Sequence, residues 1–96
     1  MLFSPALHEI SGGDEAQYAA LLAEFQEALL RTFKEVEAAE TEADWRLSTH
    51  KLKGGALAIG AEKLAARASL AEEEFRGREE TLVGLRTAYR EDFGPD

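Results

Sequence analysis

The sequence predicts an all-α protein: an antiparallel up-down four-helix bundle with a short additional N-terminal helix. Apolar residues recur every three or four positions through four successive stretches, which is the spacing of helices with one buried side. No stretch alternates apolar and polar residues for long enough to indicate a strand or a hairpin. The connections between the stretches are short, which favours antiparallel neighbours. Because the chain has 96 residues, we expect a single domain over 1–96.

The N-terminal part predicts a short helix followed by a long one. Ser4 and Pro5 are typical of an N-cap residue and the first helical position, so we expect a short helix over 4–10. Asp14 can cap the next helix, which we expect to reach about residue 39. The apolar stripe of this long helix is expected to enter the core and consists of Tyr18, Leu21, Leu22, Phe25, Leu29, Phe33 and Val36.

The rest of the chain predicts three more helices. Thr41, followed by acidic residues, indicates the start of a helix, and Gly60 indicates its C-terminal cap. We expect the third long helix over 61–76 and the fourth over about 79–93. Between these two helices, Glu72–Glu74 are expected to form a solvated face near a turn.

The helix that follows Thr41 carries the most informative stretch of the chain. One side of it is apolar and is expected to face the core through Trp45, Leu52, Ala56 and Ile59. At about 100° per residue, His50 lies on the opposite side and is expected to face solvent. Lys53 and Gly54 lie three and four positions further on, so they share its surface. The pattern therefore predicts an exposed imidazole beside an ammonium group and a patch of bare backbone.

Two adjacent glycines in the middle of a helix need an explanation. Each costs about 0.5–1 kcal/mol relative to alanine, so the pair costs roughly 1–2 kcal/mol. Gly54 would leave open space next to His50, where a bulky group or another protein can approach. Gly55 points inward and would allow a neighbouring helix to pack closely. We expect both reasons to apply.

The charge distribution sets this helix apart from the rest of the molecule. The chain has a net charge of −8, which argues against nucleic acid as a partner. Between residues 45 and 61 there is no acidic residue, and Arg46, Lys51 and Lys53 give that segment a charge of +3. The sequence therefore predicts a basic island, which suits an anionic phosphoryl group and an acidic partner surface.

Several classes of function are excluded by what the sequence lacks. It has no cysteine, hence no thiolate metal site, and no apolar run of the roughly 20 residues that cross a membrane. It has no glycine-rich phosphate-binding loop, so we expect neither a kinase nor another nucleotide-dependent enzyme. Neither histidine forms the Glu-x-x-His pair of a carboxylate-bridged metal centre, so no metal site is expected. The first residues do not resemble a signal peptide, and we expect a cytoplasmic location.

One run of residues matches a known pattern: His50, Leu52, Lys53, Gly54, Gly55, Ala56, Ile59, Gly60 and Ala61. It resembles the histidine-containing phosphotransfer (HPt) domains of bacterial and plant phosphorelays, with Thr49 and Ala58 where many members have alanine and asparagine. The resemblance implies that His50 accepts a phosphoryl group from a receiver-domain aspartate or a kinase and passes it to a response-regulator receiver domain. Lys53 would stabilise the phosphoryl oxygens, and Gly54 would keep the approach open. The domain would be a carrier without a cofactor of its own, and magnesium would come from the partner's receiver domain.

The surface around His50 is expected to dock the partner. Leu47 and Leu57 lie within about 60° of His50 around the helix and have no obvious core to enter. Arg46 and Lys51 would form a charged rim. The resemblance implies receiver domains of response regulators or a hybrid histidine kinase as partners. We expect a monomer that binds neither nucleic acid nor membrane. Two alternatives stay open: the phosphoacceptor module of a larger chemotaxis-type histidine kinase, and a non-catalytic helical adaptor bundle.

Overall fold

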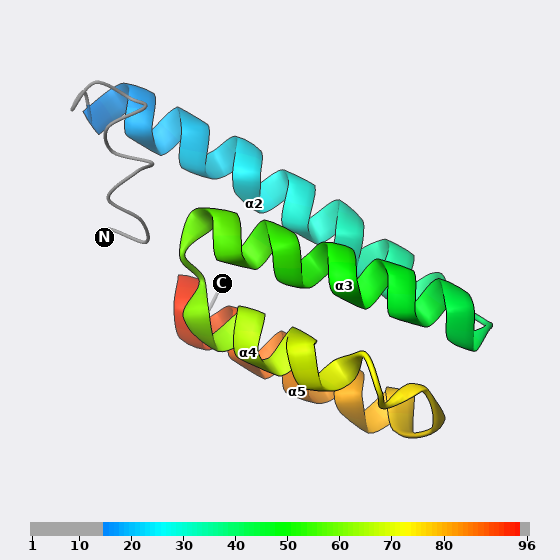
Figure 1. Ribbon diagram of the computed structural model, residues 1–96. Coiled ribbons are helices and arrows are strands. Elements are labelled where there is room, and N and C mark those ends of the chain that lie inside the picture. Colours follow the sequence, from blue (N-terminus) through cyan, green and yellow to red (C-terminus); the bar gives the residue numbers. More distant parts are fainter. Residues whose placement is uncertain (1–14, 95–96) are drawn as a thin grey trace.

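The computed structural model describes residues 15–94 of the chain (Figure 1). These residues form four α-helices, one 3₁₀ helix and no strand, which confirms the predicted all-α class. The elements are α2 (Glu15–Ala38), α3 (Glu42–Ile59), α4 (Glu62–Ala71), the 3₁₀ helix η1 (Phe75–Gly77) and α5 (Arg78–Phe93). The short helix expected over 4–10 lies outside the described residues.

Each helix lies beside the one that follows it in the sequence. α3 contacts both α2 and α4, and α4 contacts α5. The chain reverses direction at each connection (Figure 1). α5 meets α2 through side chains, with the Tyr89 ring edge-on to Phe33 at a centroid distance of 5.8 Å. α3 is thus covered by α2 and α4, and one of its sides is left facing outward.

The two ends of α3 are where the local sequence predicts them. The Thr41 hydroxyl accepts a hydrogen bond from the backbone N–H of Asp44 at 3.1 Å, so Thr41 is the N-cap residue. Gly60 adopts a left-handed conformation with φ 82°, which glycine reaches without a steric penalty. The N–H of Ala61 then returns to the Ala56 carbonyl at 2.9 Å and closes the helix end.

The prediction of one helix over 61–76 is wrong, because α4 ends at Ala71. The Ala71 carbonyl accepts a hydrogen bond from the indole N–H of Trp45 at 2.7 Å. A turn follows, and Phe75 begins η1 with its ring 6.3 Å from the Trp45 ring. Phe75 thus reaches the core from the 3₁₀ helix. Its apolar spacing continued the α4 pattern, which is why the sequence predicted a longer helix.

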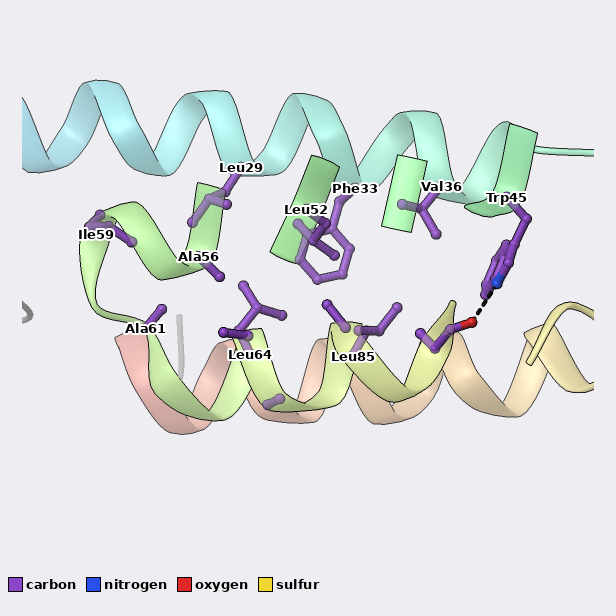
Figure 2. Packing of buried hydrophobic residues seen from close by; sticks show 14 of the residues in the cluster. Leu29, Phe33, Val36, Trp45, Leu52, Ala56, Ile59, Ala61, Leu64 and Leu85 are labelled. Carbon is purple, nitrogen blue, oxygen red and sulfur yellow. Dashed lines mark hydrogen bonds between the residues drawn. The ribbon is translucent and has the colours of Figure 1, made fainter. Parts of the chain in front are cut away.

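Buried apolar side chains from all four helices form one core (Figure 2). The stripe expected on α3 is fully buried in all four members, Trp45, Leu52, Ala56 and Ile59. It faces side chains of the other helices, namely Leu29, Phe33 and Val36 from α2, Leu64 from α4 and Leu85 from α5 (Figure 2). Because this side of α3 is anchored in the core, the residues on its other side are held outward.

Candidate functional site

His50 lies on the outward side of α3, as its position relative to the core stripe predicts. Its side chain is 71% exposed, whereas Leu52, two residues later, is fully buried. A helix rotates about 100° per residue, so anchoring Leu52 in the core turns His50 toward solvent. The imidazole is therefore accessible to another molecule.

The two glycines after His50 differ in their surroundings, as expected. A Cβ atom added at Gly54 would meet no atom within 4 Å. A Cβ atom added at Gly55 would lie 3.0 Å from Cδ2 of Leu29, a buried residue of α2. Gly54 therefore leaves open space beside His50, and Gly55 allows α2 and α3 to pack closely.

The structure adds a residue that the sequence analysis did not connect with His50. Oε2 of Glu72, the residue directly after α4, lies 3.3 Å from Nδ1 of His50. An ionised carboxylate only accepts hydrogen bonds, so this contact favours the tautomer that carries the proton on Nδ1. That tautomer has its lone pair on Nε2.

The three glutamates after α4 lie at a turn, as expected, and Glu73 is exposed, but each of the three also contacts another side chain. We call Glu72–Glu74 the acidic turn. Glu73 accepts two hydrogen bonds from Arg46, at 2.7 and 3.0 Å, in addition to the contact of Glu72 with His50. Glu74 accepts hydrogen bonds from Arg67 at 2.8 Å and from Thr81 at 3.0 Å. The hydrogen bond from Arg67 lowers the pKa of the Glu74 carboxyl below its usual value, against a smaller opposing effect of burial.

The basic island expected from the sequence is largely neutralised by acidic residues of neighbouring elements. Arg46 is paired with Glu73, and Nζ of Lys51 lies 3.1 Å from the carboxylate of Glu35 on α2. Among residues 15–94, none forms an ion pair with Lys53, which is half-buried one turn after His50. A count of charges within one segment of the sequence does not include carboxylates that reach the segment from other elements. The count over residues 45–61 therefore predicted a more positive surface than the fold provides.

The two leucines expected beside His50 are exposed. Leu47 is 70% exposed and Leu57 is 59% exposed, so neither enters the core. They lie before and after His50 along the outward side of α3. With His50, Lys53 and Gly54 they make up a surface that we call the α3 face. Large apolar side chains beside an accessible imidazole make this face a candidate contact surface for another protein.

Comparison of the chain with protein-family models, with curated proteins and with solved structures found no match. Within residues 15–94, no group of His, Cys, Asp or Glu side chains is arranged to hold a metal ion. In the same part of the chain, no helix combines the length and the apolar character needed to cross a membrane. The α3 face and the acidic turn are therefore the features of the molecule that bear on its function.

Proposed function

We propose that this protein is an HPt phosphocarrier of a multistep phosphorelay, which receives a phosphoryl group on His50 and passes it to a receiver domain. Its helices would form an antiparallel up-down bundle with a short N-terminal helix, working in the cytoplasm. The observation that carries the proposal is an exposed imidazole one turn away from an open glycine, on a helix whose other side is fixed in the core. An accessible nucleophile with free space around it is what a transfer between two proteins requires.

The transfer is a displacement at phosphorus. Nε2 of His50 attacks the phosphorus of an aspartyl phosphate on the partner. A P–N bond forms while the P–O bond to the aspartate breaks, and the aspartate leaves as a carboxylate. The proton on Nδ1 stays in its contact with Glu72, which balances the positive charge that develops on the ring. The reverse displacement by a second receiver aspartate returns the imidazole to its starting state.

Lys53 is suited to stabilise the transferred group. The phosphoryl oxygens carry negative charge in the transition state, and a nearby ammonium group offsets it. Arg46 and Lys51 are each held by a carboxylate of this chain, whereas Lys53 has no ion pair among residues 15–94. Lys53 can therefore turn to the phosphoryl group without breaking an ion pair within residues 15–94.

The α3 face would dock the receiver domain of a response regulator or of a hybrid histidine kinase. Leu47 and Leu57 would be covered by the partner, which removes exposed apolar surface from water. Arg46 and Lys51 would form the rim and exchange their present carboxylates for those of the acidic partner. The chain would act as a monomer, and the partner's receiver domain would supply magnesium.

The decisive experiment is transfer from phosphorylated receiver domains of the same host. We expect the protein to acquire an acid-labile label that His50→Gln abolishes. His8→Gln is the matched control, because it removes the only other histidine of the chain, and it should be labelled normally. A label that persists in His50→Gln would contradict the assignment.

The exposed leucines also favour a second candidate, a helical adaptor that binds a partner without phosphotransfer. In that case Leu47→Ala with Leu57→Ala would abolish binding, while His50→Gln would leave both binding and cellular output unchanged. In a phosphocarrier, His50→Gln should preserve binding and abolish output. The two variants therefore distinguish the two functions.

A further inference from the structure

One polar contact in the core connects α3 with the acidic turn. The side chain of Trp45 is fully buried, and its indole N–H donates to the Ala71 carbonyl at 2.7 Å (Figure 2, dashed line). Ala71 is the last residue of α4, and the next residue is Glu72. The hydrogen bond thus attaches α3 to the point at which the acidic turn begins.

This hydrogen bond lies directly beside Glu72 along the chain. Trp45 and His50 belong to the same helix, so the indole and the imidazole keep a constant separation along it. When Ala71 is held by Trp45, the adjacent Glu72 lies 3.3 Å from Nδ1 of His50. Phe75 packs against the Trp45 ring from the far side of the turn. The same indole therefore contacts both ends of the turn, by a hydrogen bond at Ala71 and by ring packing at Phe75.

We propose that Trp45 is a positioning residue for His50. By donating to the Ala71 carbonyl, the indole fixes the acidic turn in the position at which Glu72 contacts Nδ1. The proton of the neutral imidazole then stays on Nδ1, and the reactive lone pair stays on Nε2. The importance of that lone pair for phosphotransfer rests on the proposed function. The control of the tautomer itself does not, because it involves only residues of this chain.

The test compares tautomers of His50 by ¹⁵N NMR at about pH 9, where imidazole is neutral. All samples carry His8→Gln, so that a single imidazole contributes signals. The starting protein, which carries only His8→Gln, should contain mainly the Nδ1–H tautomer. Trp45→Phe keeps an aromatic ring and removes the donor together with part of the buried indole, and the loss of packing is controlled by Phe75→Leu. It should lower the ratio of Nδ1–H to Nε2–H by roughly two- to tenfold, the effect of one hydrogen bond of ordinary net strength.

Two further variants define the range of the measurement. Glu72→Ala removes the carboxylate itself. It should lower the ratio of Nδ1–H to Nε2–H at least as much as Trp45→Phe does. Phe75→Leu disturbs the packing around the indole but keeps its N–H, so its ratio should stay at the starting value. An equal shift in Phe75→Leu would overturn the proposal, because packing alone would then position Glu72.

The remaining outcomes are equally informative. An excess of Nε2–H in the starting protein, or an unchanged ratio in Trp45→Phe, would overturn the proposal. If Trp45→Phe does not fold, hydrogen exchange of the indole N–H in the unmodified protein replaces it: strong protection supports the hydrogen bond, and exchange at the rate of an exposed indole contradicts it. The NMR experiment contains no phosphoryl donor, so its failure is distinct from a failure of receiver domains to label His50.

Discussion

Replacing the two glycines of α3 one at a time separates packing from access. In a helix, alanine is more favourable than glycine by about 0.5–1 kcal/mol. At Gly54 the added methyl group would meet nothing within 4 Å, so Gly54→Ala should gain this amount in full. In a domain of this size the melting temperature should rise by about 2–8 °C.

At Gly55 the same change should have the opposite sign. The new Cβ atom would lie 3.0 Å from Leu29, whose buried side chain must move by a few tenths of an ångström to make room. Overfilling a packed core costs about 1–3 kcal/mol, which outweighs the helical gain and leaves a net loss of roughly 0–2.5 kcal/mol. Thermal unfolding followed by circular dichroism measures both variants. An equal increase in the melting temperature of both would refute the assignment of Gly55 to helix packing.

Gly54→Leu tests whether the open space at Gly54 matters for phosphotransfer. Leucine is a good helix former and the site is open, so the variant should be at least as stable as the native protein. A bulky side chain beside His50 should nevertheless slow transfer from a phosphorylated receiver at least about tenfold, since small misplacements of reacting groups are costly. Undiminished transfer in this variant would refute the role of Gly54 in access.

Three further changes test single contacts. Lys53→Ala should slow phosphotransfer about tenfold or more without lowering the helical circular dichroism signal, and a loss of that signal would mean that the lysine is structural. Asp92→Ala removes the carboxylate that accepts the Leu64 N–H at 2.8 Å and caps α4. It should cost about 1 kcal/mol, or about 4–8 °C in melting temperature, and an unchanged value would contradict this capping. Glu74→Gln should lower stability at neutral pH, because Arg67 lowers the pKa of Glu74 in the folded state. The difference from the native protein should disappear in urea unfolding as the pH falls below the ordinary glutamate range, and a difference that grows in acid would contradict it.

The parts of the fold that depend on local chemistry were predictable from the sequence. The hydroxyl of Thr41 and the left-handed Gly60 act within a few residues of their own position, and both ends of α3 lie where these residues predict them. The core stripe of α3 and the exposure of His50 follow from helical periodicity alone.

The features that depend on contacts between helices were not predictable in this way. α4 ends at Ala71, where a carbonyl meets an indole 26 residues away in the sequence. Glu35 and Glu73 neutralise basic residues of α3 from other elements, so a charge count along the chain predicted a more positive surface than the fold provides. Glu72 appeared as one of several surface glutamates because its neighbour His50 is 22 residues away.

The most direct test of the account is to identify the phosphorylated atom. The protein should be incubated with a phosphorylated receiver domain from its host and analysed by ³¹P NMR and by peptide mass spectrometry at neutral pH. We expect one phosphohistidine, at His50, with the phosphoryl group on Nε2, stable in base and lost in acid. A label on any other residue, or no label from any receiver domain of the host, would contradict the proposed role of His50.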